Sequence, residues 1–242
     1  MNNFINFTDI DVKNERTWRG KCILTLDTDW AIDPVLEYCY NIIKRYKIKA
    51  SIFLTNETKV LKEIKQNPLI EVGMHPNFNK IFNGEPDTVE NILKKIKKVA
   101  KKSEILRSHC LTTSASWYPL YKKYGIKYTS NFSMIGHSNI SPIVKVNGII
   151  ECPIFFADDA FLLVHGKFSS KGIKRELMKN NSGLRVLLFH PIHVFLNSKS
   201  LSAYEKIKPF YHDITKLKQS VNTKEMGSLD ALNQAIELLL GD

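Results

Sequence analysis

The sequence predicts an α/β protein whose strands form a closed or nearly closed β/α barrel. Short apolar runs alternate with amphipathic segments along most of the 242 residues, which is the pattern of parallel strands joined by crossover helices. The number of such runs, about seven, favours a barrel over an open doubly wound sheet. The chain contains neither GxGxxG nor GxxxxGK[ST], so nothing indicates a nucleotide-binding fold.

The predicted strands are mostly continuous apolar runs, as expected for strands that are buried on both faces. The run 22–27 is the first of them, and the run 184–189 is the last strong one. In chain order, the expected strands are 22–27, 50–54, 69–74, 105–109, 126–130, 149–154, 160–165 and 184–189.

The predicted helices carry apolar residues at helical spacing, and the first begins at Asp33 and Pro34, two residue types favoured at helix starts. The expected helices are 33–47, 58–66, 87–102, 114–124, 169–179, 200–211 and 228–240, with loops at 76–86 and 131–148. We expect a single domain over 1–242, in which 1–20 is an irregular lead-in and 200–242 is a C-terminal helical extension.

Composition indicates a soluble cytoplasmic protein. Hydrophobic residues make up 43% and charged residues 24%, which is enough to bury a full core. No run approaches the roughly 18 apolar residues of a membrane helix, and the N-terminus does not resemble a secretory signal. The four cysteines form no CxxC pair and suit a reducing compartment.

The net charge is +11, and six lysines fall within the segment 87–102. We expect these lysines to form the solvated face of an amphipathic helix. Attraction to an anionic partner, such as a phosphate-bearing substrate or a membrane surface, is left open. Nucleic acid is not expected, because no basic segment is interleaved with aromatic residues.

Four of the predicted strands end in groups that ionise or bind metals. Because ligands and chemistry gather at the carboxyl ends of strands in α/β folds, this pattern indicates an active site. The groups are Asp27 and Asp29, then His75, then Arg107 and His109, and finally His190 and His193.

Asp27 and Asp29 are two residues apart, and two carboxylates this close raise each other's proton affinity unless a cation lies between them. A divalent metal would bind one and leave the other free as a base. His75 is a suitable nitrogen ligand, and the combination of Asp and His favours zinc, with Co, Ni, Mn and Fe as alternatives. The third ligand is either Asn79 or His109.

The remaining groups have expected roles around such a metal. Arg107 would pair with the free aspartate and orient it. His190 would protonate a leaving group. His193 would orient His190 or contact substrate, and Trp30 would either line a sugar-stacking wall or pack in the core.

The motifs TLDTDW, KASIFLTN, GMHPNFN, RSHCL and LLFHPIH resemble, in this order, those of the polysaccharide deacetylases, the NodB-homology fold of carbohydrate esterase family four. The resemblance covers residues 22–197 and is greatest to the deacetylase-like proteins of surface-polysaccharide gene clusters. It implies a distorted (β/α)7 barrel and metal-dependent removal of an N- or O-acetyl group.

By position, the resemblance makes Asp27 the base, Asp29 and His75 the metal ligands, and Arg107 the residue that orients Asp27. His190 is then the acid. Two positions depart from the family pattern. Asn79 stands where the family has its second metal histidine, and His109 replaces the proline of the arginine motif, so His109 is a candidate substitute ligand.

We therefore expect a metal-dependent deacetylase of an acetylated sugar or of a surface-polysaccharide precursor such as that of O-antigen. Two alternatives remain: a non-catalytic barrel that binds such a precursor or a partner enzyme, and an amide hydrolase of a small metabolite. The sequence does not determine the sugar, the linkage, its nucleotide or lipid carrier, or the oligomeric state.

Overall fold

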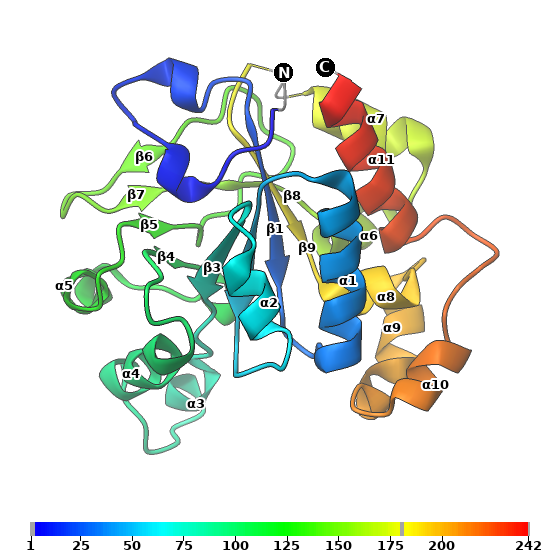
Figure 1. The fold of residues 1–242 in the computed structure, drawn as a ribbon, viewed down its shortest axis with the longest axis horizontal. Coiled ribbons are helices and arrows are strands. Elements are labelled where there is room, and N and C mark those ends of the chain that lie inside the picture. Colours follow the sequence, from blue (N-terminus) through cyan, green and yellow to red (C-terminus); the bar gives the residue numbers. More distant parts are fainter. Residues whose placement is uncertain (1–2, 180–181, 242) are drawn as a thin grey trace.

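The computed structural model describes residues 3–179 and 182–241; residues 1–2 and 242, at the ends of the predicted lead-in and extension, lie outside it, as do 180–181. The described residues form a mixed sheet of nine strands, curved as a half-barrel, in the order β6-β7-β5-β4-β3-β2-β1-β9-β8 (Figure 1). The strands are β1 Cys22–Asp27, β2 Ala50–Leu54, β3 Ile70–Met74, β4 Ile105–Leu106, β5 Tyr128–Thr129, β6 Ile143–Val144, β7 Ile150–Glu151, β8 Ile154–Ala157 and β9 Arg185–Phe189.

The chain itself joins the two sides of this curved sheet. Only Cys152 and Pro153 separate β7, which pairs in parallel with β5, from β8, which pairs in parallel with β9. A further bridge joins Ser133, beyond β5, to Ile154. With β7 and β8 taken as one bent strand and the antiparallel β6 set aside, seven strands remain around the barrel, which confirms the predicted fold class.

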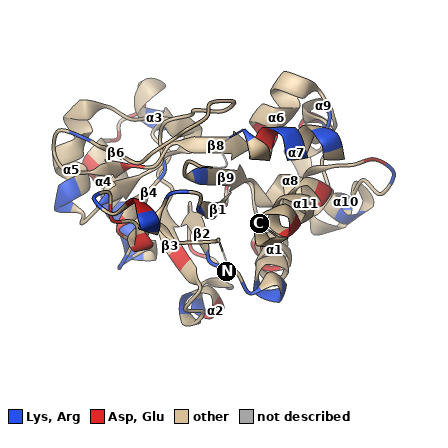
Figure 2. Cartoon of the chain, turned by 90° about the horizontal axis from the view of Figure 1, so that it is seen from above, with Lys and Arg blue, Asp and Glu red and all other residues tan. Residues whose placement is uncertain are grey.

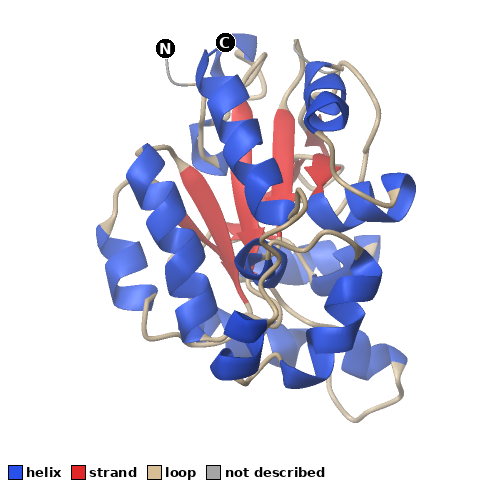
Figure 3. Cartoon of the chain, turned by 90° about the vertical axis from the view of Figure 1, so that its right-hand side faces the viewer, coloured by secondary structure: helices blue, strands red, loops and turns tan. Residues whose placement is uncertain are grey.

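Helices cover the outside of the sheet (Figure 3). The α-helices are α1 Asp33–Tyr46, α2 Leu61–Gln66, α3 Asn79–Phe82, α4 Val89–Val99, α5 Tyr118–Lys123, α6 Asp158–His165, α7 Ser170–Met178, α8 Pro191–Leu196, α9 Leu201–Ile207, α10 Ile214–Gln219 and α11 Ser228–Gly241. Short 3-10 turns are η1 Phe7–Asp9, η2 Glu15–Thr17, η3 His109–Leu111, η4 Ala115–Trp117 and η5 Lys208–Phe210.

Strand β1 lies between β2 and β9 in the barrel wall. All six of its residues are buried, and it pairs in parallel with β2 on one side and β9 on the other. Residues of both α1 and α11 pack in the same core cluster as Leu24 and Leu26 of this strand. The continuous apolar run of the sequence therefore produces a rigid strand whose last residue is Asp27.

One predicted strand is wrong. The segment 160–165 belongs to helix α6, which begins at Asp158 with Asp159 beside it in the first turn. Carboxylates at a helix N-terminus are favoured by its exposed backbone N–H groups, and Gly166 ends the helix in a left-handed conformation. A short apolar run does not by itself distinguish a strand from a buried helix.

Other boundaries also differ. The predicted strand 105–109 ends at Leu106, so Arg107 directly follows the strand and His109 lies in the turn η3. The predicted loop 76–86 contains α3, the loop 131–148 contains β6, and helices α8 and α10 were not predicted.

The lysine-rich segment forms α4, whose Ile92, Leu93 and Ile96 are buried. Lys94, Lys95 and Lys98 lie exposed on its outer face. Figure 2 shows further Lys and Arg on other outer helices, including α9 and α10. Among the described residues, none of the helices combines the length and apolar character that crossing a membrane requires.

Candidate active site

A cavity of about 280 Å³ opens where β1, β3 and β9 end. Asp27, His75 and His190 line it from these three strand ends, and His109 lines it from the turn after β4. The four sequence motifs therefore converge on one cavity, as strand ends do in α/β barrels.

Asp29, His75 and His109 form a compact cluster in this cavity. The Oδ2 atom of Asp29 lies 2.8 Å from Nε2 of His75 and 2.6 Å from Nδ1 of His109. His75 is buried, whereas Asp29 and His109 are partly exposed toward the cavity. Both imidazoles thus point at the same carboxylate oxygen.

The cluster holds Asp29 ionised. Burial alone would raise the pKa of Asp29, but hydrogen bonds and charge from His109 and His75 lower it below its ordinary value. Burial alone would lower the pKa of His75, but the neighbouring carboxylates of Asp27 and Asp29 raise it. The carboxylate of Asp29 and the imidazoles of His75 and His109 are therefore held together in one small volume.

This donor set fits a divalent metal ion. One carboxylate oxygen and two imidazole nitrogens lie within 4.8 Å of one another, and the combination suits zinc well. Nδ1 of His75 is also buried without a hydrogen-bond partner in the described chain, and lies 3.8 Å from Oδ2 of Asp27. Asp29, His75 and His109 therefore fit the divalent metal ion that the sequence predicts.

Asp27 has different partners from Asp29. Its Oδ1 accepts a hydrogen bond of 2.9 Å from the guanidinium of Arg107, which is fully buried. Arg107 is itself held by Thr25 at 2.7 Å, by Ser130 at 2.8 Å, and by the ring of Phe53, whose centroid lies 4.6 Å away. A buried cation with this many contacts fixes the orientation of the Asp27 carboxylate.

His190 faces the cavity from the end of β9. Its Nδ1 lies 2.8 Å from Oδ1 of Asp158, and its backbone N–H donates to Oδ2 of the same residue. Ser228 of α11 also donates to Asp158. Burial would lower the pKa of His190, but the charge and hydrogen bond of Asp158 raise it to about 10. The imidazole is therefore protonated at neutral pH.

The other candidate residues lie around this centre. His193 is buried against the ring of Tyr204, with centroids 4.4 Å apart, and burial lowers its pKa. Trp30 is 40% exposed and lines the cavity, so it is not a core residue. Asn79 begins α3 and is not among the described residues that line this cavity.

Sequence reasoning missed Asp158, which the structure pairs with His190. The available signal was the Asp158–Asp159 pair directly after an apolar run, the same pattern that identified Asp27. The apolar pattern predicts a strand over 160–165, and this places the acidic pair between two strands rather than at a helix start beside His190. Thr25 and Ser130, which hold Arg107, carry no comparable signal in the sequence.

A curved, mostly parallel sheet with a carboxylate–imidazole cluster at its strand ends is the arrangement expected for a NodB-type polysaccharide deacetylase. Residues 24–208 match the model of the WbmS-like polysaccharide deacetylase family. The structure is also similar to that of WbmS from Bordetella bronchiseptica, described as a proposed polysaccharide deacetylase involved in O-antigen biosynthesis. The TM-score is 0.91, with 30% identity, over 98% of this chain and 98% of that chain. The chain belongs to the WbmS-like polysaccharide deacetylase family.

More distant structures share only a weak likeness. The peptidoglycan deacetylase PdaC from Bacillus subtilis is 16% identical, with a TM-score of 0.44 over 90% of this chain and 94% of that chain. BA3943, a CE4 family pseudoenzyme from Bacillus anthracis, is 14% identical, with a TM-score of 0.44 over 84% of this chain and 63% of that chain. No curated protein matches this chain.

Proposed function

We propose that the protein is an active, metal-dependent deacetylase that removes an acetyl group from an N- or O-acetylated sugar of a surface-polysaccharide precursor. One observation carries the proposal. Asp29, His75 and His109 meet at one point, next to a second carboxylate, Asp27, that a buried arginine holds in place. This separation of a ligand carboxylate from a base carboxylate is what hydrolysis of an amide or ester at a metal centre needs.

Asp29, His75 and His109 would hold the ion, with zinc as the best match to these donors. When bound, it supplies a Lewis acid that polarises the acetyl carbonyl and lowers the pKa of water. The donors lie just beyond β1, just beyond β3 and in the turn after β4, so the fold itself sets their separation.

Asp27 acts as the general base and takes a proton from the attacking water. Its Oδ1 is occupied by Arg107, which leaves Oδ2 as the oxygen nearer the imidazole of His75. Because Arg107 is buried and fully held, the carboxylate does not need to be oriented during the reaction.

His190 acts as the general acid and gives a proton to the departing sugar nitrogen or oxygen. Asp158 holds Nδ1, so Nε2 is the nitrogen directed to substrate, and the pairing keeps the ring protonated at neutral pH. His193 packs against His190 with ring centroids 5.7 Å apart and positions it.

We place the activity in the cytoplasm. The four cysteines are all unpaired, and three of them are buried, which suits a reducing compartment.

Acetate release from acetylated mono- and oligosaccharides tests the proposal, with protein that is treated with EDTA and then reloaded with zinc, cobalt, nickel or manganese. We expect release that disappears with chelation and returns with one of the metals. A protein that binds no divalent metal and releases no acetate with any of them would contradict the proposal, and would favour a non-catalytic sugar-binding barrel.

A further inference from the structure

The turn η3, which presents His109 to the candidate metal site, has an unfavourable backbone. Cys110 and Leu111, the two residues after His109, are both left-handed, with φ of 54° and 55°. Residues other than glycine adopt this conformation rarely, and it persists where surrounding contacts impose it. The position of His109 therefore depends on contacts that hold the turn in this shape.

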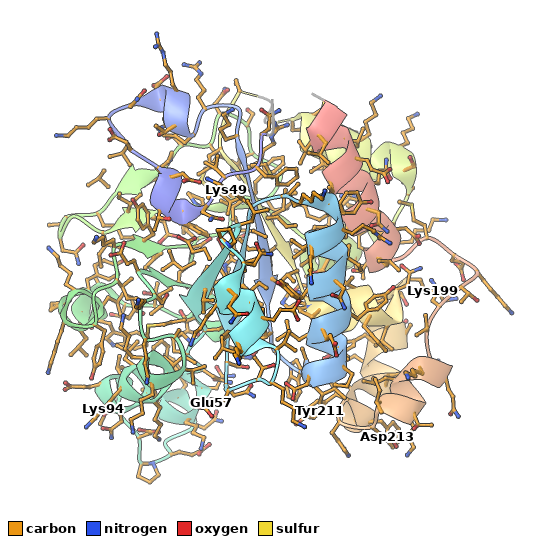
Figure 4. All side chains as sticks on the ribbon, in the orientation of Figure 1. Lys49, Glu57, Lys94, Lys199, Tyr211 and Asp213 are labelled. Atoms are coloured by element: carbon orange, nitrogen blue, oxygen red, sulfur yellow. The ribbon has the colours of Figure 1, made fainter. Side chains whose placement is uncertain are left out.

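The cavity side of the turn offers little support. Among the described residues, the ring of His109 has one hydrogen-bond partner, the carboxylate of Asp29, while its backbone N–H donates to the carbonyl of Pro76. His109 also lines a second cavity, of about 520 Å³, together with Glu57 and Tyr211, two side chains on the lower side of the molecule in Figure 4. Further support for the turn must therefore come from the protein interior.

The interior holds the turn at Ser108, the fully buried residue before His109. The backbone N–H of Ser108 donates to Oδ1 of Asn131 at 2.8 Å, and its Oγ lies 3.0 Å from the same oxygen. The Ser108 hydroxyl also donates to the backbone carbonyl of Thr112, just beyond the end of the turn. The side-chain oxygen of Asn131 therefore fixes the point at which the turn begins.

Asn131 is itself fixed by Glu151 of β7, a buried carboxylate with 2% exposure. Oε1 of Glu151 accepts the backbone N–H of Asn131 at 2.6 Å, and Oε2 accepts the hydroxyl of Thr129 at 2.7 Å. Lys145 pairs with Oε2 as well, so the buried carboxylate has a cation beside it. Buried polar networks whose members are satisfied are rigid. Asn131 is therefore a fixed point on the barrel wall.

The residue before Asn131 supports the other half of the site. Ser130 is fully buried and accepts hydrogen bonds from Arg107 at its backbone carbonyl, at 3.1 Å, and at its Oγ, at 2.8 Å. Arg107 in turn contacts Asp27. Ser130 and Asn131 are therefore adjacent, equally inaccessible residues, one of which supports the candidate base and the other the turn that carries a candidate ligand.

We propose that Asn131 is a positioning residue for the metal site: its buried side-chain oxygen holds Ser108, and with it the turn that brings His109 to Asp29. Asn131 is not among the described residues that line the cavity, so it acts through His109. This inference rests on the proposed function, because it takes His109 as the third ligand.

Zinc affinity of the full-length protein, measured against a competing chelator without substrate, tests the role of Asn131. Asn131→Ala removes the acceptor of Ser108 and should weaken zinc binding by about tenfold, a usual cost of disturbing a group that orients a ligand. His109→Ala should weaken it at least as much. Adding Asn131→Ala to His109→Ala should cause no further loss, because the ligand that Asn131 orients is then absent. The visible absorption bands of cobalt-loaded Asn131→Ala should also shift, since they depend on coordination geometry.

Ser130→Ala is the matched control, because it removes an equally buried hydrogen-bonding group from the adjacent residue. It should keep the wild-type zinc affinity and reduce turnover, since it weakens the support of Arg107. If Asn131→Ala does not fold, Ser108→Ala takes its place, because it removes the hydroxyl that bonds across the turn. Wild-type zinc affinity in the folded variant, an equal loss in Ser130→Ala, or a further loss in the double variant would overturn the proposal.

Acetate release separates this inference from the proposed function. Wild-type zinc affinity in Asn131→Ala, in a protein that releases acetate, would overturn the role of Asn131 and leave the deacetylase proposal standing. The expected affinity losses in a protein that releases no acetate would support the role of Asn131 and count against the deacetylase. Wild-type zinc affinity in His109→Ala would overturn both this inference and the proposed set of ligands.

Discussion

Asp27 and Asp29 are two positions apart, yet they have different environments. Asp27 is the last residue of β1, and the buried Arg107 contacts it. Asp29 lies beyond the strand, where His75 and His109 meet it. Because the strand ends between them, the two aspartates have different partners. Asp27 is therefore the candidate base and Asp29 the candidate metal ligand.

Replacing Asp27 with Asn tests this division. The amide keeps the size of the side chain but cannot accept a proton from water, so turnover should fall by about 10²–10⁴-fold. Metal content, measured by elemental analysis of the same preparation, should stay at the wild-type level because the ligands are untouched. Loss of the metal in Asp27→Asn would instead exchange the roles of the two aspartates.

The third ligand is tested by a parallel pair of substitutions. Nδ1 of His109 lies 2.6 Å from Oδ2 of Asp29, whereas Asn79 is not among the described residues that line the cavity. His109→Ala should weaken divalent-metal binding by about tenfold or more, and Asn79→Ala should weaken it less. Titration of both variants with zinc against a competing chelator measures the difference. A greater loss in Asn79→Ala would mean that His109 contacts substrate or only packs.

The pair of His190 and Asp158 makes stability depend on pH. Pairing with Asp158 raises the pKa of His190 from 6.5 to about 10. The stability that protonated His190 contributes is therefore complete below about pH 6.5 and is lost as pH rises toward 10. The pKa of Asp158 is lowered from its ordinary value of 3.8. The stability that the Asp158 carboxylate contributes is therefore present above pH 3.8 and is lost as pH falls further.

Asp158→Asn should therefore destabilise the protein most between pH 3.8 and pH 6.5, where both members of the pair are charged. We expect a loss of about 3 kcal/mol near pH 6, since one partner of a buried pair is removed, and a smaller loss near pH 9. Urea unfolding of wild type and variant at both pH values measures it. A loss of the same size at both values would show that the charge on His190 plays no part.

At the scale of elements, β3 and β2 together support Arg107. Gly73 of β3 lies opposite Phe53 of β2, and a Cβ atom at residue 73 would come within 2.4 Å of the Phe53 ring. That ring is also the surface on which the Arg107 guanidinium rests. Gly73 therefore leaves room for the Phe53 ring, which supports Arg107, and Arg107 in turn orients the Asp27 carboxylate.

Gly73→Ala should lower the free energy of unfolding by about 1–3 kcal/mol because it overpacks the core. It should also reduce turnover, since displacement of Phe53 removes the support of Arg107. Gly241→Ala is the matched control, because no atom lies within 4 Å of its added methyl group. Similar melting temperatures for Gly73→Ala and the control would show that Phe53 can move aside freely.

At the scale of the whole molecule, the last helix belongs to the main core rather than to an appendage. Ala231, Leu232, Ala235, Ile236 and Leu239 of α11 are all fully buried in the cluster that also contains β1 and α1. Ser228, at the start of this helix, bonds to Asp158. The C-terminal residues therefore contribute both to stability and to the surroundings of His190.

Leu232→Ala should destabilise the protein by about 2–5 kcal/mol, the usual cost of truncating a buried leucine. Leu240→Ala on the same helix should change stability by less than about 0.5 kcal/mol, because Leu240 is 39% exposed. Chemical denaturation of the two variants makes the comparison. A small effect of Leu232→Ala would mean that α11 can detach while the barrel stays folded.

The sequence alone determined the barrel and the polar ends of its strands, because buried parallel strands are continuous apolar runs and the residues that end them are local features. The long helices α1 and α11 were predicted for the same reason, from local periodicity. Where an apolar run was short, as at 160–165, local pattern did not separate strand from helix, and Asp158 was missed as a result.

Only the tertiary structure decided which polar groups meet. His109 lies outside the strand that was expected to aim it, yet it contacts Asp29 because the turn η3 redirects the chain. The partners of Arg107 and His190 come from strands and helices far apart along the chain, as do the rings of Trp30 and Tyr211, which pack together. Such contacts depend on how the elements pack, and no local pattern encodes them.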